Sequence, residues 1–190
     1  MNMTKIYKYG FAWVASLALL AMAPPAKAAG AEDELIQKLA SPMAQTVTEA
    51  LQQLEKKYPT STKALPTIKN LLIDSRASVR RKAARVLGSL HAEVDHDNIK
   101  AICKLLQASD VAEITDGLKA LRGLKAADAV PEITPFLKHS NTHLVRDACR
   151  TLAVLGNKDL IPSIEPLLNH KEPAVQKDAQ DAIAVLRAKS

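Results

Sequence analysis

The sequence repeats itself, and this repetition constrains the fold more than any other feature. The stretch VPEITPFLKHSNTHLVRDACRTLAVLG, from Val130, aligns with IPSIEPLLNHKEPAVQKDAQDAIAVLR, from Ile161, at a period of 31 residues. A further step of 31 residues toward the N-terminus reaches a third copy, a step of 34 reaches a fourth, and a weaker copy precedes these. The five units lie near residues 35–58, 65–90, 99–124, 130–156 and 161–187. A repeat of this length is typical of arrays in which each unit packs against its neighbours.

Each unit has the pattern of two helices. A short apolar segment, here named helix A, is followed by a polar turn and then by a longer segment, helix B. In the second unit Val79, Ala83, Val86, Leu87 and Leu90 fall within one arc of a helix, and no segment of the chain alternates with period two. Neither helix can bury its apolar stripe alone, so the units must stack. The sequence therefore predicts an all-α domain over residues 31–190, a solenoid of about five two-helix repeats.

The units resemble HEAT repeats, in particular the short form named for phycobilisome lyases. That pattern has a proline inside helix A, a polar turn, a Val-Arg pair, an alanine four residues after the valine, and a leucine near the end of helix B. The matching residues are Pro135 and Pro166 in helix A, and Val79, Arg80, Ala83 and Leu87 in helix B. The resemblance covers residues 35–190. It implies a right-handed α-solenoid (an ARM/HEAT superhelix) whose B helices line a concave face, and it implies interaction far more often than catalysis.

Two units depart from the family pattern. The third lacks the helix-A proline and has Gly117 where alanine is expected, and the fourth has its pair, Val145 and Arg146, offset by one residue. Where the proline is present, at Pro135 and Pro166, we expect helix A to be kinked, because proline removes an amide donor and clashes with the preceding turn.

The last unit has a polar residue at a position that is apolar in the units before it. The residue after the helix-B alanine position is Ala84, Leu118 and Cys149 in the second to fourth units, and Gln180 in the fifth. The first three are expected to pack against the following unit. Because a solenoid needs a polar outer face at its end, Gln180 is expected to face solvent.

Residues 1–28 have the pattern of a secretory signal peptide. Lys5 and Lys8 give a positive start, residues 11–23 form an apolar run, and residues 26–28 read Ala-Lys-Ala, a small-x-small cleavage pattern. The run is shorter than the roughly 20 residues that a membrane-spanning helix needs. Cleavage after residue 28 or 29 would give a periplasmic or secreted protein with no stable membrane insertion. An uncleaved anchor is the alternative.

Two exposed helix-B positions are mostly basic across four adjacent units. In the second unit these positions lie nearly opposite the apolar arc. The basic residues, named here the basic ridge, are Arg81, Arg85, Lys119, Arg146, Arg150 and Lys177. Two interpretations stand. The residues form a solvated polar face, since lysine and arginine favour exposed helix positions, or they bind an acidic protein segment or an anionic envelope polymer.

Composition argues against a nucleic-acid partner. The formal charge of +6 falls to +3 once the three lysines of residues 1–28 are removed. Tyr58 and Phe136 are then the only aromatic residues, whereas single-stranded nucleic acid is bound largely by stacking on aromatic faces. Export would also separate the chain from nucleic acid.

The two cysteines and five histidines do not indicate a metal or catalytic centre. Cys103 aligns with an exposed helix-A position and Cys149 with the contact between units, so we expect two free thiols, with a disulfide as the alternative. His139 and His170 share one turn position in successive repeats, which indicates a surface residue copied with the repeat. No zinc ligand set, nucleophile motif or phosphate loop stands out, so we expect no metal, no cofactor and no catalysis.

These observations predict a non-catalytic exported scaffold or adaptor that binds a protein partner along the concave helix-B face. One alternative follows from the family resemblance, because phycobilisome-lyase-type repeats attach bilins to antenna proteins. It is a lyase-like or chaperone-like protein that acts on a cofactor or its carrier protein. A third interpretation is a stability module whose groove binds nothing specific.

Overall fold

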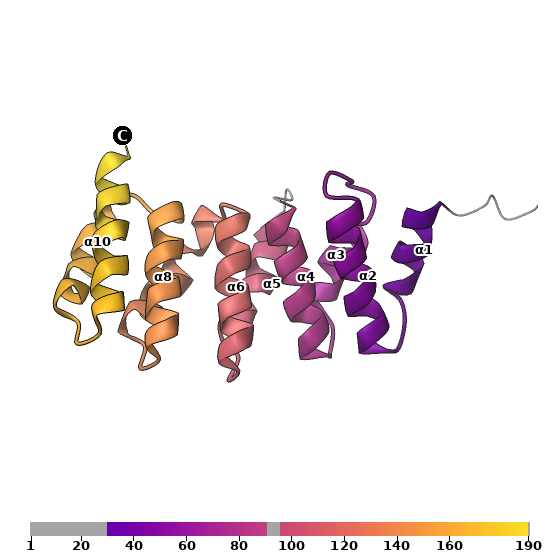
Figure 1. Cartoon of the computed structure of the whole chain (residues 1–190), viewed down its shortest axis with the longest axis horizontal. Helices are drawn as coiled ribbons and strands as arrows, with labels where there is room; N and C mark the ends of the chain where they lie inside the picture. Colours follow the sequence, from indigo (N-terminus) through magenta and orange to yellow (C-terminus); the bar gives the residue numbers. More distant parts are fainter. Residues whose placement is uncertain (1–29, 91–95, 190) are drawn as a thin grey trace, which may run out of the picture.

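The computed structural model describes residues 30–90 and 96–189, and the predicted signal peptide lies outside these residues. Within them the chain forms ten α-helices and five short 3-10 helices, and no strand. The B helices of the five units stand side by side in a row (Figure 1). They are α2 (Ala44–Lys57), α4 (Ala77–Ser89), α6 (Val111–Gly123), α8 (Thr142–Leu155) and α10 (Pro173–Ala188). The predicted all-α solenoid of two-helix repeats is thereby confirmed.

The A segments are shorter; α3 and α5 lie behind this row, and α1 stands at its end beside α2 (Figure 1). They are α1 (Ala31–Lys38), α3 (Leu65–Asn70) with the 3-10 helix η1 (Leu71–Ile73), α5 (His96–Leu105), α7 (Val130–Ile133) with η3 (Thr134–Lys138), and α9 (Ile161–Ile164) with η5 (Glu165–Asn169). The short 3-10 helices η2 (Ala127–Ala129) and η4 (Lys158–Leu160) precede α7 and α9.

Proline changes the type of helix within the A segments. In the fourth and fifth units the α-helix passes into a 3-10 helix at the residue before Pro135 and before Pro166. A proline at this point lacks the amide donor that would continue the α-helical ladder. By contrast α5, which has no internal proline, continues as one α-helix of ten residues. Proline is not the only cause, since α3 passes into η1 without one.

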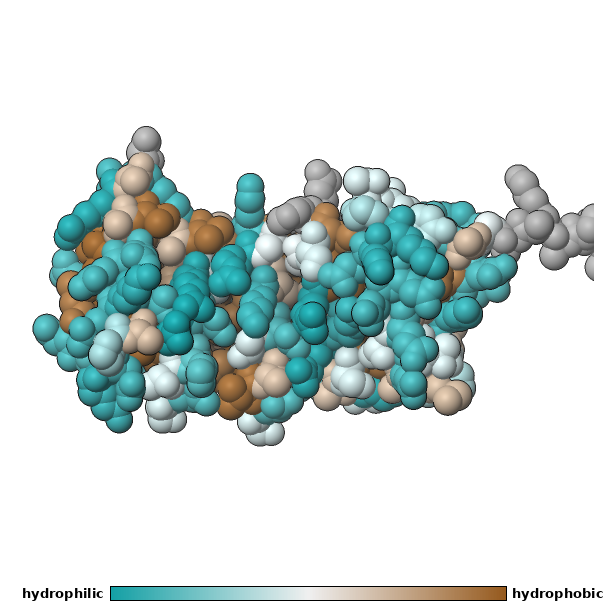
Figure 2. Space-filling model, viewed as in Figure 1, coloured by the Kyte–Doolittle hydropathy of each residue, from teal (hydrophilic) through white to brown (hydrophobic). Residues whose placement is uncertain are grey.

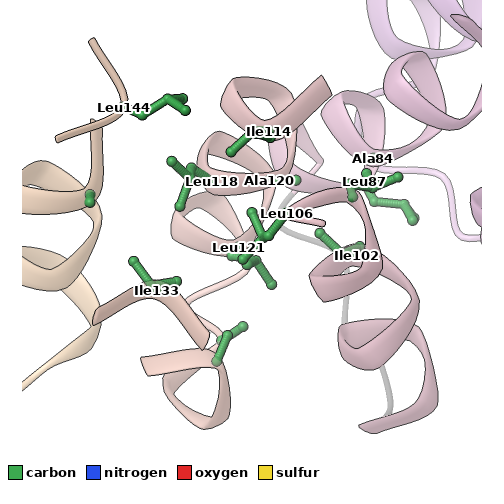
Figure 3. Packing of buried hydrophobic residues seen from close by; sticks show 14 of the residues in the cluster. Ala84, Leu87, Ile102, Leu106, Ile114, Leu118, Ala120, Leu121, Ile133 and Leu144 are labelled. Carbon is green, nitrogen blue, oxygen red and sulfur yellow. The ribbon is translucent and has the colours of Figure 1, made fainter. Parts of the chain in front are cut away.

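The apolar stripes of the two layers meet in one continuous core. Leu87 of α4, Ile102 of α5 and Leu121 of α6 are fully buried, and their side chains gather between these three helices (Figure 3). Deleting such a side chain costs roughly 2–5 kcal/mol, because a cavity replaces the lost contacts. Each unit is therefore held by its neighbours as well as by its own pair of helices.

The position after the helix-B alanine behaves as predicted along the array. Ala84, Leu118 and Cys149 are fully buried between successive units, whereas Gln180 is exposed. Across residues 30–90 and 96–189, none of the helices combines the length and the hydrophobicity that a membrane span requires.

Candidate partner-binding face

All six residues of the basic ridge lie on the row of B helices. Arg81 and Arg85 are on α4, Lys119 on α6, Arg146 and Arg150 on α8, and Lys177 on α10. The repeat places them at equivalent heights because each helix B begins at an equivalent residue. Figure 2 shows the side of the molecule on which the B helices lie, and hydrophilic residues cover most of it.

Three arginines of the ridge pair with aspartates on the following B helix. Arg81 Nε lies 2.8 Å from Asp116 Oδ2, and Arg146 Nε lies 2.6 Å from Asp178 Oδ2. Arg150 Nη2 also approaches Asp178 Oδ2, at 3.0 Å. The two aspartates are only 7% and 8% exposed, so their charges would be costly without these partners. These arginines therefore link adjacent repeats, and the ridge is not a uniformly free positive surface.

The sequences of neighbouring units, compared with each other, indicate this pairing, whereas the sequence of one helix alone does not. Aspartate occupies one helix-B position in the third, fourth and fifth units, as Asp116, Asp147 and Asp178. Asp147 and Asp178 each follow a residue of the basic ridge, and Asp116 follows Thr115 at the same repeat position. A basic residue in one unit followed by an aspartate in the next predicts an ion pair between neighbouring helices.

The remaining cations of the ridge are less engaged. Arg85 is exposed, and its Nε lies 3.9 Å from Asp116 Oδ1. Lys119 and Lys177 are exposed, and neither has an ion-pair partner within the described residues. The free positive charge of this face is therefore concentrated at three positions instead of six.

One hollow lies at the centre of the row, between α4 and α6 and beside α8. Its volume is about 470 Å³, and we name it the basic hollow. It is lined by Arg85, Gly88, Ser89, Lys119, Ala120, Arg122, Gly123 and Val154. Three of these residues are cations and none is an acid, so the hollow brings together two residues of the predicted ridge and one that was not predicted.

The floor of the hollow is bare backbone. A Cβ atom on Gly123 would lie 2.4 Å from the carbonyl oxygen of Gly88, and one on Gly88 would lie 2.8 Å from the Cα atom of Ala120. Real Cβ atoms do not approach backbone so closely, so a side chain at either glycine would push α4 and α6 apart. The two glycines allow the close approach of the helices and leave the space above them open.

Arg122 is the cation that sequence reasoning missed. It is half-buried on the last turn of α6 and has no ion-pair partner in the part of the chain that the structure describes. The equivalent positions in the second, fourth and fifth units are Gly88, Ala153 and Ala184. The aligned repeats do mark this residue, because it is basic where the equivalent residues are glycine or alanine. A pattern of charge that recurs from unit to unit does not include it.

A second arginine clamp joins the second and third units, away from the basic hollow. Arg80 Nη2 and Nε donate to Glu113 Oε1 at 2.8 and 3.0 Å. Arg80 Nη1 donates to the carbonyl oxygens of Asp74 and Ser75 at 2.9 and 3.0 Å. The side chain of Arg80 thus binds the backbone of the turn in its own unit and neutralises the buried carboxylate of Glu113 in the next unit.

The two cysteines are free thiols, so the disulfide considered from the sequence is not formed. Burial raises the pKa of the Cys103 thiol to about 11, with a smaller contribution from the charge of Glu132. Burial also raises the pKa of the Cys149 thiol to about 12, and the charge of Asp178 adds to this. Neither thiol is activated as a nucleophile, because the thiolate is the reactive form.

The turn histidines have a structural role. His139 Nδ1 accepts the backbone N–H of Asn141 at 2.9 Å, and His170 Nδ1 accepts that of Glu172 at 3.0 Å. Both bonds satisfy an amide just before a B helix, which accounts for the repetition of histidine at this position. Over residues 30–90 and 96–189, no group of three or more His, Cys, Asp or Glu side chains could hold a metal ion.

A larger hollow of about 770 Å³ lies among the A segments of the fourth and fifth units. Four prolines line it, together with Thr134, Leu137, Lys138 and Ser163; the prolines are Pro131, Pro135, Pro162 and Pro166. Its lining carries one cation, against three in the basic hollow.

No protein-family model matches the sequence, and no curated protein matches it either. Among solved structures, the chain is similar to the complex of CpcE and CpcF of phycocyanin lyase from Nostoc sp. PCC7120. The TM-score is 0.70 at 22% identity, over 83% of this chain and 65% of that one. This chain therefore spans less than two thirds of the lyase chain that it matches.

Designed proteins have the same architecture. A designed armadillo repeat protein in complex with the peptide (KR)4 aligns with a TM-score of 0.65 at 17% identity, over 82% of this chain and 81% of that one. Computationally designed armadillo repeat proteins for modular peptide recognition align with a TM-score of 0.61 at 18% identity, over 82% and 81% of the two chains. These likenesses show that the fold is an α-solenoid of the HEAT/ARM type.

Proposed function

We propose that this protein is an exported, non-catalytic scaffold that binds a protein partner along the row of B helices. The observation that carries the proposal is the basic hollow. Lys119 and Arg122 line it beside Arg85, and no carboxylate lines it with them. Like charges gathered in one concavity repel each other, so the arrangement favours the arrival of an opposite charge.

The architecture supports a protein partner. A row of parallel helices offers an extended surface, which is how solenoids bind other chains. The designed armadillo protein of the same fold was solved with a peptide, and the phycocyanin lyase structure is a complex of two proteins. Nucleic acid is a poorer candidate, because the charge without residues 1–28 is only +3 and two aromatic residues remain.

Export is the second part of the proposal and rests on residues 1–28 alone. We propose that this segment is a signal peptide and that the mature chain is periplasmic or secreted. The likeness to a lyase subunit is one of fold, so we assign no cofactor and no catalytic step to this chain.

Site-specific photocrosslinking in the native cell tests the proposed binding face. A photoreactive amino acid is placed at Lys119 or Lys177 on the B helices, and at Lys138 as the matched control on an A segment. All three are exposed lysines without an ion-pair partner among the described residues. We expect a defined protein adduct from the B-helix positions and none from the control, and mass spectrometry would identify the partner.

Three other results would count against the proposal. Adducts from Lys138 alone would move the binding face to the A segments and their larger hollow. An intact N-terminus on the protein recovered from the cytoplasmic fraction would exclude export. Visible absorbance of the purified protein would favour the lyase-like alternative instead.

A further inference from the structure

We propose that the basic hollow holds a carboxylate of an acidic, extended segment of the partner, and that an apolar side chain of the same segment rests on Val154. The inference rests on the proposed function and adds the chemistry of the partner and the residues that select it.

The hollow keeps its positive charge after nearby opposite charges are counted. Arg85, Lys119 and Arg122 contribute three charges. The hollow lies near the C-terminal ends of α4 and α6, and the carbonyls there contribute only about half a negative charge per helix. The two helix ends together offset about one of the three positive charges, so the hollow keeps a net positive charge.

Two carboxylates near Arg85 are held more closely by other cations. Asp116 is 3.9 Å from Arg85 but is bound more closely by Arg81, at 2.8 Å. Burial opposes a lowering of the pKa of Glu55 that comes from hydrogen bonds with Ser89 and Lys82 and from the charges of Lys82 and Arg85, and Lys82 binds this carboxylate at 3.0 Å. Neither acid is therefore available to neutralise the three cations of the hollow.

The equivalent place between α8 and α10 lacks these features. The residues equivalent to Lys119 in those two helices are Arg150, which pairs with Asp178, and Asp181, which is itself an acid. The residues equivalent to Arg122 are alanines. The positive charge of the basic hollow therefore does not simply accompany the fold, because the place between α8 and α10 does not share it.

Apolar surface continues from the hollow along the row. Val154 lines the hollow and is 44% exposed, and Val185, one repeat further on, is 45% exposed. Figure 2 shows hydrophobic residues reaching the surface at the upper ends of α8 and α10. A segment that crosses the B helices would place a carboxylate at Arg122 and, further along, an apolar side chain on these valines.

The chemical groups of the three cations suit a carboxylate. A guanidinium group binds a carboxylate through two parallel N–H bonds, and the hollow offers two guanidinium groups and an ammonium group. The backbone floor at Gly88 and Gly123 lets the ligand sit low between the helices. The volume of about 470 Å³ lies within the usual range of ligand sites, about 300–1,000 Å³.

Fluorescence anisotropy with a defined probe tests the inference. The probe is a fluorescein-labelled, glutamate-rich peptide with one central leucine, titrated with the purified protein. We compare Lys119→Gln/Arg122→Gln with the control Lys100→Gln/Lys158→Gln, which removes the same charge from exposed lysines of α5 and η4. We expect the hollow variant to lose about tenfold in affinity and the control to change less than about twofold, with binding weakened by salt.

Further probes separate the acidic segment from other ligands. A peptide with glutamine in place of glutamate should not bind, and one with serine in place of leucine should bind more weakly. Equal loss in the two variants, equal binding of the glutamine peptide, or displacement by an equal concentration of inorganic phosphate would each overturn the assignment. If crosslinking at Lys119 captures a partner while the hollow variant still binds the glutamate peptide normally, this inference fails and the proposed function stands.

Discussion

Substitution of Arg80 by alanine is expected to destabilise the array by about 3 kcal/mol, because it leaves a buried carboxylate without a partner. The side chain of Glu113 is 6% exposed, and its Oε1 accepts two hydrogen bonds from Arg80. Removing one member of a buried ion pair costs about 3–5 kcal/mol. The side chain of Arg80 is itself 25% exposed, which places the expected cost at the lower end of that range.

Substitution of the other member of the pair, Glu113, by an apolar residue should be much milder. The positions equivalent to Glu113 in the second, fourth and fifth units are Val79, Leu144 and Val175, all fully buried. Glu113→Leu restores the apolar residue of the repeat, and Arg80 keeps its carbonyl partners and its contact with water. We expect a change of about 1 kcal/mol or less, because replacing a buried charge by a well-packed apolar side chain is often neutral or stabilising.

Thermal unfolding followed by far-ultraviolet circular dichroism measures both effects. For a domain of this size 1 kcal/mol corresponds to about 2–4 °C in Tm, so Arg80→Ala should lower Tm by about 6–12 °C. The double variant Arg80→Ala/Glu113→Leu should recover most of that loss. The reasoning is refuted if Arg80→Ala changes Tm by less than about 2 °C, or if the double variant is no more stable than Arg80→Ala alone.

Three further predictions follow from glycine packing, buried thiols and a turn carboxylate. Gly123→Ala should destabilise by about 1–3 kcal/mol, measured by urea unfolding, because the added methyl group collides with backbone. Cys103 and Cys149 should react slowly with a thiol reagent near neutral pH. Stability should fall as pH rises from about 9 toward about 11, since the unfolded state releases its thiol protons first. The hydrogen bond from the side chain of Arg76 lowers the pKa of Asp74 in the folded protein. The stability that this carboxylate contributes above about pH 4 should therefore be lost as the pH falls below about 4, and the Asp74→Asn variant should lose stability less steeply in acid.

Each of these has a result that would count against it. An unchanged urea midpoint for Gly123→Ala would mean that α4 and α6 separate without cost. Rapid labelling of Cys149 in the folded protein would contradict its burial. An Asp74→Asn variant that loses stability in acid as steeply as the wild type would exclude this carboxylate as a source of acid sensitivity.

The helices of the fold and their stacking could be predicted from the sequence for two reasons. The spacing of apolar residues within one short segment indicates a helix, and the recurrence of that segment indicates which sides of neighbouring units pack together. The helical periodicity of Val79 and Leu87 reports which side of one helix is buried, and repetition reports that neighbouring units bury equivalent sides. The same logic placed Cys149 between units and Gln180 in solvent, as the structure confirms. The 3-10 segment of the second unit, η1, was not predicted, because no proline marks it.

The candidate site was only partly predictable. The positions of Arg85 and Lys119 on the B-helix row followed from the alignment of repeats, and both line the basic hollow. Their binding of a partner remains a prediction. Arg122 was missed, because its charge does not recur in the other units and a search for recurring charge passes over it.

The sequence by itself determined the class of the molecule: a stack of helix pairs, with a row of cations on one helix of each pair. Only the tertiary structure decided which cations are free. Arg81 and Asp116 are 35 residues apart along the chain, and their 2.8 Å contact depends on how closely α4 and α6 pack. That distance is controlled by the missing side chains of Gly88 and Gly123, which also open the hollow. The periodicity of apolar residues shows which side of a single helix is buried, whereas the distance between two helices depends on the side chains of both.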